Sequence, residues 1–466
     1  MNEIIINLDK HTKRPLYIQI YLYIREEIKS GRIKKGSQLP SIRSLAKNLN
    51  VSKITIDNAY QQLLVEGYIE SKKGSGMYVL EIEESILPPT KIDNIETYLS
   101  LNSNNIEYDF NYGSIDIESF DLNSWKKLAS QILNSSDKEF LQYGDPQGEI
   151  ELRKEISKYL RTSRGVLCSE NQVIITSGTS NSLQLICELI DDKSVAIENP
   201  CWDRAKYVFQ KNNFKITPIS LDKNGISFKY LKKVSAKLVY ITPSHQFPSG
   251  IVMPIARRQK LLNWANDNDA FIIEDDYDSE FRYTSNPIPS LQSIDNNDRV
   301  IYLGTFSKSL APSLRLSYLI LPKELLTKYY ENITMHEQNT SRITQKTLEL
   351  FMAHGYWERH IRKMRKLYSK KYNNLIKSIE SEFNDDIRII GGNAGLHILI
   401  EIRNGMSENK IISITKKAGI KIYPTSKYWV NKNNTKYPIF LIGFGALSEK
   451  QIVDGIKLLK NVLFEI

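Results

Sequence analysis

Few features of this 466-residue chain fit a secreted, disulfide-stabilised or membrane-spanning protein. It has only three cysteines, an odd number without the CxxC spacing of redox or zinc sites: Cys168, Cys187 and Cys201. No stretch approaches the roughly 18 apolar residues that span a bilayer, and residues 1–10 lack the apolar core of a signal peptide. We therefore expect a cytoplasmic protein with no disulfide framework and no metal site.

The chain also lacks internal repeats and long low-complexity tracts, and its length favours two or three folded domains. Its 41% hydrophobic and 25% charged residues are typical of a folded soluble protein. The formal net charge of +10 is uneven, because residues 1–80 contain 13 Lys/Arg against 7 Asp/Glu, a net of +6. This excess indicates a polyanionic partner for the N-terminal part, although it is also compatible with solubility alone.

Residues 1–80 have the pattern of a small helical module that ends in a hairpin. Apolar residues recur every four positions after Pro15, which suits the first turn of a helix. Two short helices are expected after Ser41 and Ser52, because serine is a favoured N-cap. Strands over 68–71 and 77–80 then flank a basic, glycine-rich turn. This order predicts a winged helix-turn-helix that reads DNA with its second short helix and its wing.

The runs 39–46, 51–55 and 66–69 resemble the winged helix of GntR-family transcription regulators, and the resemblance spans nearly all of residues 11–80. Family members often have arginine where this chain has Lys53, and some have it at the position of Asp57, which leaves the bases that are read open. Taken singly, Arg43 and Lys53 also fit solvated helix charges. The resemblance implies that six residues lie at double-stranded DNA: Arg43, Ser52, Lys53, Thr55, Lys73 and Gly74.

Residues 81–108 are expected to form a linker. The segment opens with glutamates, contains Pro88-Pro89 and the polar run 102–105, and has no sustained apolar period. From Asp109 onward, short apolar strands alternate with amphipathic helices, which predicts an α/β fold with a largely parallel sheet.

Three strand ends in this larger domain carry polar groups. Residues 173–176 lead into a Ser/Gly turn and a helix, a geometry that presents amides to a phosphate but is common in α/β folds. The strand 271–274 ends in Asp275-Asp276-Tyr277, where alternation places Asp275 and Tyr277 on one side and Asp276 on the other. The strand 300–304 delivers Lys308 in a Ser/Thr-rich turn.

Lys308 is followed seven positions later by Arg315, an arrangement suited to pyridoxal 5'-phosphate (PLP). A buried amine with a lowered pKa forms a Schiff base with the aldehyde, while hydroxyls and a guanidinium take the phosphate charge. A carboxylate such as Asp275 would keep the ring nitrogen protonated. Taken singly, Lys308 also fits a surface charge and Asp275 a strand-end cap.

The segments 143–148, 242–250, 273–283 and 305–315 resemble the fold-type I aminotransferases, and specifically the MocR-type regulators, in which a GntR winged helix is fused to such a domain. The resemblance implies that Lys308 forms the internal aldimine, that Asp275 pairs with the pyridine nitrogen and that Tyr277 contacts the 3'-oxygen. The phosphate would be held by Ser177, Gly178, Thr179, Thr305, Ser307 and Arg315.

The same resemblance assigns three further residues. Trp202 would stack on the ring, His245 stands near the asparagine that contacts the ring oxygen in simpler aminotransferases, and Tyr143 would come from the partner subunit of a homodimer. Trp202 and Tyr143 also fit plain core aromatics. The domains implied are a winged helix over 1–80, the linker, and an aminotransferase-like domain over 109–466. Its small subdomain, from about 385 to 466, should contain strands near 396–402 and 440–444 and a final helix.

Relatives usually carry a carboxylate-gripping arginine at the position of Leu441. Without a guanidinium at this position, the main group that would bind the carboxylate of an amino acid is missing. Arg204 could still bind a carboxylate, or it could belong to a surface helix. Three hypotheses remain: a regulator that senses PLP and controls vitamin B6 synthesis, a regulator that senses an amino compound such as gamma-aminobutyrate, and an aminotransferase with a DNA-binding module. Leu441 favours the first hypothesis and speaks against the second and the third.

Overall fold

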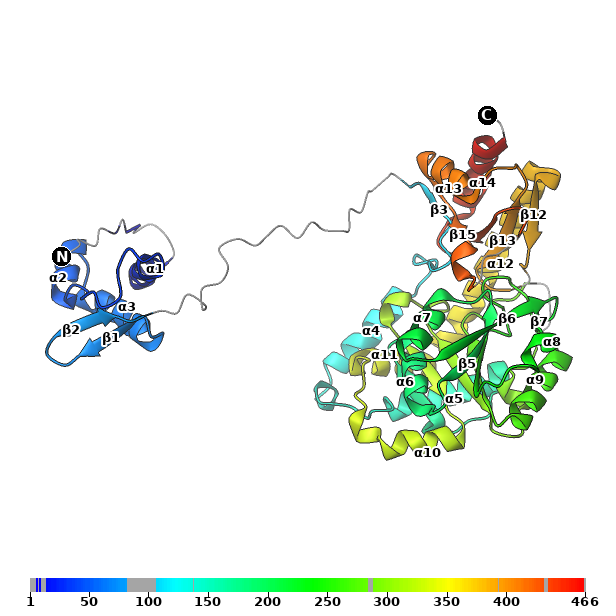
Figure 1. Cartoon of the computed structure of the whole chain (residues 1–466), viewed down its shortest axis with the longest axis horizontal. Helices are drawn as coiled ribbons and strands as arrows, with labels where there is room; N and C mark the ends of the chain where they lie inside the picture. Colours follow the sequence, from blue (N-terminus) through cyan, green and yellow to red (C-terminus); the bar gives the residue numbers. More distant parts are fainter. Residues whose placement is uncertain are drawn as a thin grey trace. The chain divides into compact units, whose positions relative to one another are not determined.

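The computed structural model describes residues 6, 8–9, 14–81, 106–136, 138–283, 288–392, 394–430 and 435–464. The chain divides into two compact units, Met1–Leu101 and Asn102–Ile466 (Figure 1). Most of the expected linker, residues 82–105, lies outside the described residues. Within the described ranges, no helix is both long and apolar enough to cross a membrane.

In the described residues of the N-terminal unit, three helices precede a hairpin. Ser41 and Ser52 cap the second and third helices, because their hydroxyl oxygens accept the backbone N–H groups of Ser44 and Thr55, as predicted. The apolar faces meet in a core that contains Ile24, which is fully buried. The elements are α1 (Leu16–Lys29), α2 (Ile42–Leu49), α3 (Lys53–Val65), β1 (Ile69–Lys72) and β2 (Gly76–Val79), and the two strands pair antiparallel.

An eight-stranded sheet forms the centre of the second unit, in the order β4-β11-β10-β9-β8-β5-β6-β7. The run from β10 to β6 is parallel, whereas β11 and β7 are antiparallel to their neighbours. This arrangement confirms the predicted α/β fold. The strands are β4 (Val173–Thr176), β5 (Ser194–Asn199), β6 (Lys215–Asp222), β7 (Gly225–Ile226), β8 (Leu238–Ile241), β9 (Phe271–Asp276), β10 (Val300–Thr305) and β11 (Ser317–Ile320).

Helices pack on both faces of this sheet because its buried strands are apolar on alternate sides. Ile273 belongs to the core with α6 (Thr179–Leu189), α7 (Asp203–Lys211) and α10 (Lys323–Glu331). Its neighbour Ile272 belongs to the core with α8 (Phe228–Leu231) and α9 (Ile255–Asp267). A third core, built on β4, β10 and β11, includes α4 (Leu122–Leu133), α5 (Ile150–Arg164) and α11 (Arg342–Ala353).

A smaller antiparallel sheet, β12-β13-β16-β15, forms the C-terminal part. Its strands are β12 (Ile387–Ile390), β13 (His397–Ile402), β15 (Tyr423–Pro424) and β16 (Ile439–Gly443). Of these, β13 and β16 match the two strands expected here, and β12 and β15 were not predicted. The helices are α12 (Tyr356–Phe383), α13 (Glu408–Lys417) and the predicted final helix, α14 (Glu449–Phe464). In addition, β3 (Tyr108–Asp109) pairs with β14 (Ile420–Lys421). That pairing brings the start of the unit to the C-terminal part, so that Tyr112 lies against Gly443.

Candidate functional site

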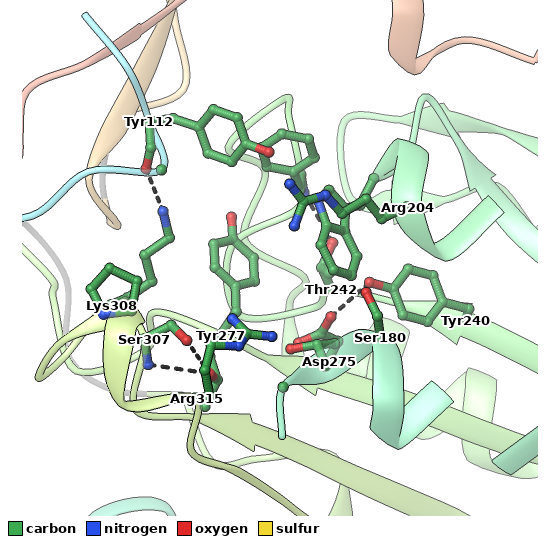
Figure 2. A pocket seen from close by; sticks show the side chains of 17 residues that line it. Tyr112, Ser180, Arg204, Tyr240, Thr242, Asp275, Tyr277, Ser307, Lys308 and Arg315 are labelled. Atoms are coloured by element: carbon green, nitrogen blue, oxygen red, sulfur yellow. Dashed lines mark hydrogen bonds between the residues drawn. The ribbon is translucent and has the colours of Figure 1, made fainter. Parts of the chain in front are cut away.

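A cavity of about 270 Å³ lies where β8, β9 and β10 end (Figure 2). Parallel α/β sheets bind their ligands at the carboxyl ends of the strands. Most residues assigned to the cofactor by resemblance line this cavity: Gly178, Thr179, Trp202, Asp275, Tyr277, Thr305, Ser307, Lys308 and Arg315. Its other lining residues are Tyr112, Gly113, Ser180, Arg204, Tyr240, Thr242, Phe247 and Pro312.

Lys308 projects into the cavity from the turn that follows β10 (Figure 2). Its Nζ donates to the backbone carbonyl of Tyr112 and lies 4.9 Å from the centroid of that ring. Burial lowers the pKa of Lys308 to about 8, against an opposing contribution from the negative charge of Asp278. The amine is therefore neutral more often than an ordinary lysine at neutral pH, as nucleophilic chemistry requires.

The two carboxylates at the end of β9 point to opposite faces of the sheet, as predicted. Oδ2 of Asp275 accepts a 2.6 Å hydrogen bond from the hydroxyl of Tyr240 on the cavity side. Burial raises the pKa of Asp275 to about 7, although the bond from Tyr240 lowers it. Asp276 instead forms a buried ion pair of 2.7 Å with Arg164. The pKa of Asp276 falls to about 2, because the nearby Arg164 charge and its hydrogen bonds outweigh the effect of burial.

A positively polarised cradle lies at the start of α6. Gly178 caps this helix with φ +129° and no side-chain cap, so the first amides of the helix face the cavity. A Cβ on Gly178 would stand 2.2 Å from Nη2 of Arg315, so the guanidinium lies directly against the helix end. Oγ1 of Thr305 accepts the N–H of Ser307 at 3.2 Å, which orders the Lys308 turn beside them. A helix N-terminus, a guanidinium and hydroxyls together fit a phosphate.

Three of the residues assigned by resemblance do not line the cavity. Ser177 precedes the lining residue Gly178 in the chain, and the backbone N–H of Ser177 donates to Oδ1 of Asn181 at 3.3 Å. His245 lies behind Tyr277, whose hydroxyl is 3.0 Å from both Nδ1 and the backbone oxygen of His245. Tyr143 is fully exposed on this chain. Its assignment to a partner's pocket stays a prediction.

Several residues that line the cavity were not predicted from the sequence. Tyr112 reaches Lys308 only because β3 pairs with β14, a contact without a local sequence signal. Tyr240 had a usable signal, because it occupies the same face as Asp275 on the neighbouring parallel strand. Arg204, the candidate partner for a ligand carboxylate, lies on the cavity wall near the start of α7, beside Trp202.

Leu441 lies fully buried on β16 and packs among the aromatic residues around the cavity. Its cluster includes Phe247 and Tyr428, with Tyr112 and Trp202 at its border. Among the described residues that line the cavity, the arginines are Arg204 and Arg315. Arg315 lies in the phosphate cradle, so Arg204 is the guanidinium left to meet a carboxylate.

The residues assigned to DNA lie on α2, at the start of α3 and on the hairpin. Arg43 and Lys53 are exposed, and Lys73 and Gly74 are exposed in the turn between β1 and β2. Thr55 is partly buried, and its hydroxyl lies 2.8 Å from that of Ser52, which is occupied by the cap of α3. The exposed charges among these residues are therefore Arg43, Lys53 and Lys73, and their contact with DNA stays a prediction.

Comparisons with known proteins agree with both units. The family of bacterial regulatory proteins of the gntR type matches residues 16–79, and the aminotransferase class I and II family matches residues 97–434. The solved structure of kynurenine aminotransferase from Pyrococcus horikoshii is 26% identical, with a TM-score of 0.70 over 78% of this chain and 92% of that one. This similarity confirms the fold-type I aminotransferase architecture, whose members are PLP-dependent.

Relatives that combine the two units match almost end to end. The HTH-type transcriptional regulator YhdI of Bacillus subtilis is 43% identical over 97% of both chains. The pyridoxine biosynthesis regulator PdxR of Corynebacterium glutamicum is 28% identical over 95% of both. The probable rhizopine catabolism regulatory protein MocR of Rhizobium meliloti is also 28% identical, over 97% of this chain and 95% of its own. The chain therefore belongs to the MocR-type transcription regulators of the GntR family.

Proposed function

We propose that this regulator binds PLP through Lys308 and that PLP is itself the signal by which it controls genes of vitamin B6 synthesis. The observation that carries the proposal is the cavity, in which Lys308, Asp275 and the Gly178–Arg315 cradle line one space of about 270 Å³. A nucleophilic amine, a carboxylate and a phosphate site are the three groups that PLP needs.

The lining residues fit the cofactor in chemistry as well as in type. When bound, PLP supplies an aldehyde that bonds to a lysine amine and a ring that withdraws electrons. Lys308 would hold the aldehyde carbon, and Asp275, oriented by Tyr240, would hold the ring nitrogen. The amides at the start of α6, with Arg315, would hold the phosphate. Trp202 and Tyr277 would contact the ring.

Leu441 supports PLP, rather than an amino acid, as the signal. An aliphatic side chain cannot pair with a carboxylate. Leu441 occupies the position where relatives usually carry an arginine, and it is packed within an aromatic cluster. PdxR, a relative over nearly the whole chain, is described as a regulator of pyridoxine biosynthesis. We carry that role over as part of the proposal.

Arg204 supports a second candidate. Its guanidinium lies on the cavity wall opposite Lys308 and is open to a ligand (Figure 2). An amino compound with a carboxylate, such as gamma-aminobutyrate, would then displace Lys308 from the cofactor while Arg204 holds its acid group. The same contact would serve an aminotransferase. An aminotransferase would differ from a sensor because it converts the amino compound in repeated catalytic cycles.

DNA control requires that the ligand-free and ligand-bound states differ in free energy on the operator. We propose a homodimer, because Tyr143 would complete the pocket of its partner, and two winged helices would then read paired half-sites. Either activation or repression is compatible with this arrangement.

Absorbance separates these candidates. Purified full-length protein mixed with PLP should turn yellow, and Lys308→Ala should abolish the visible band; colourless wild-type protein would contradict cofactor binding. Amino acids and gamma-aminobutyrate are then added to the loaded protein. An unchanged visible band supports PLP as the signal, whereas conversion of the cofactor to its amine form supports the second candidate, and conversion with turnover supports an aminotransferase.

A further inference from the structure

One face of α3 in the N-terminal unit carries exposed side chains without a charge (Figure 1). Ile54, Asn58, Gln61 and Val65 follow one another at spacings of four, three and four, so they lie along one side of the helix. All four are exposed, Ile54 by 71% and Val65 by 82%. The buried residues of α3 occupy the opposite side and belong to the core of the unit. We call these four exposed residues the α3 stripe.

The two amides of the α3 stripe are available to a partner. Neither Asn58 nor Gln61 forms a side-chain hydrogen bond with another described residue. The neighbouring Gln62, outside the stripe, instead donates to Oε1 of Glu66 at 2.6 Å. An amide carries a donor and an acceptor side by side. The stripe therefore offers two donor–acceptor groups between two apolar side chains.

Exposed cations lie on the elements that adjoin the stripe. Lys53 begins α3, Arg43 and Lys47 belong to α2, and Lys73 lies in the turn between β1 and β2. Both α2 and β1 pack against α3. None of these four cations forms an ion pair with another described residue. A polyanion such as the DNA backbone is the partner that this charge fits.

The chemistry of the α3 stripe matches one kind of base pair. In the major groove, adenine presents an acceptor beside a donor, which an amide pairs in two hydrogen bonds, and thymine presents a methyl group to apolar side chains. Guanine presents two acceptors, which are usually read by Arg or Lys, and the stripe has neither. Asp57, partly buried at the border of the stripe, adds a carboxylate, which when ionised only accepts hydrogen bonds and disfavours guanine further.

We propose that the α3 stripe reads A·T base pairs in the major groove, with Asn58 and Gln61 bonded to adenines and Ile54 against a thymine methyl. Ile54 to Gln61 rise about 10 Å along the helix, which is the length of about three base-pair steps. Val65 ends α3, beyond the N-terminal residues that a reading helix inserts. The inference deepens the proposed function and rests on its DNA contact, but not on PLP as the signal.

The first test selects binding sites for full-length wild-type protein from a library of random DNA duplexes. The enriched half-sites should contain a run of about three A·T pairs, the length that the stripe covers. Enriched sites without such a run would overturn the base preference and leave the DNA contact standing. A library from which nothing is enriched would overturn both.

The second test changes single atoms of the selected site that face the major groove. Uracil in place of thymine removes the methyl group, and wild-type affinity should fall about fourfold, the usual worth of one buried methyl group. The replacement of adenine by 7-deazaadenine removes the acceptor N7, and affinity should fall about fivefold, the usual worth of a neutral hydrogen bond. Wild-type affinities that do not change with either analogue would overturn the proposal.

Variants then assign each contact to a side chain. Ile54→Ala should lose the response to uracil and keep the response to 7-deazaadenine. Asn58→Ala and Gln61→Ala should each lose the response at one adenine and keep the response to uracil. Val65→Ala is the matched control for an exposed apolar residue of the stripe, and Gln210→Ala is the control for an exposed amide of the second unit. Both controls should respond as the wild type does.

Two further measurements separate the remaining outcomes. All variants change exposed residues, so their Tm should stay close to that of the wild type. If Ile54→Ala keeps its response to uracil and changes the oligomeric state in analytical ultracentrifugation, the stripe is a protein interface and the proposal is overturned. The DNA titrations are repeated with saturating PLP. If the A·T preference holds in both conditions and PLP leaves affinity and footprint unchanged, the base contacts stand and PLP fails as the signal.

Discussion

The hydroxyl of Tyr240 donates a 2.6 Å hydrogen bond to Oδ2 of Asp275, and both side chains are buried in the wall of one cavity. The two residues come from the neighbouring parallel strands β8 and β9, whose register puts them on the same face. A phenol that donates to a carboxylate favours its ionised form. In the proposed PLP site, Tyr240 would therefore prepare Asp275 to pair with a protonated ring nitrogen.

Removal of that hydroxyl should weaken PLP binding. In Tyr240→Phe the pKa of Asp275 rises from its value of about 7, because the hydrogen bond that lowers it is lost. A smaller ionised fraction near neutral pH should reduce PLP affinity about tenfold, the usual worth of a hydrogen bond to a charged group. Absorbance titration measures the change, with the buried Tyr329→Phe as the control. Equal affinities for both variants would argue against the role of Tyr240.

Covalent uptake of PLP should accelerate as the pH rises. The attacking amine must be neutral, and the pKa of Lys308 is lowered to about 8 by burial. The bimolecular rate constant should therefore rise across pH 7 to 9 with a midpoint near 8. Stopped-flow absorbance gives this profile. A rate constant that keeps rising toward pH 10.5, the ordinary value for lysine, would show that Lys308 is not tuned.

Gly178→Ala should damage the phosphate cradle. The new Cβ would stand 2.2 Å from Nη2 of Arg315, and the backbone conformation, with φ +129° and ψ 162°, would cost a residue with a Cβ about 1–3 kcal/mol. PLP affinity should fall at least tenfold and Tm should decrease. Gly405→Ala is the control for backbone strain alone, because its φ is +74° and nothing lies within 4 Å. Similar losses of PLP affinity in the two variants would remove the case for the cradle.

Lys53→Ala should weaken DNA binding through the lost phosphate or base contact at the start of α3. If the contact is to a phosphate, the slope of log affinity against log salt should become smaller by about one. Fluorescence anisotropy on DNA upstream of the gene measures both, with the exposed Lys229→Ala in the second unit as the control. Unchanged affinity and slope would exclude Lys53 from the interface.

Local patterns predicted most of the fold and the chemistry of the cavity. Alternation along β9 separated Asp275 from Asp276, and the serine caps marked the starts of α2 and α3, because these effects act over a few residues. The predicted strands of the hairpin are shifted by one residue from β1 and β2. The ends of short strands depend on hydrogen bonds to the neighbouring strand and are therefore hard to predict from local sequence.

Contacts across long sequence separations could not be predicted in the same way. Lys308 and Tyr112 are 196 positions apart and meet through the pairing of β3 with β14. His245 was expected near the ring oxygen, but its Nδ1 is engaged by Asp278, 33 positions along the chain, which draws the side chain behind Tyr277. Such positions depend on tertiary packing and leave no periodic signal in the sequence.

The proposed role of PLP as the signal requires that PLP change the interaction of this protein with DNA. Full-length wild-type protein is titrated onto DNA upstream of vitamin B6 synthesis genes, with and without PLP at a concentration that saturates the visible absorbance. We expect the apparent Kd to change about fivefold or more, or the footprint to change, as is usual for allosteric coupling, and Lys308→Ala to show no response. Identical binding and footprints of the wild type with and without saturating PLP would contradict the proposal that PLP is the signal.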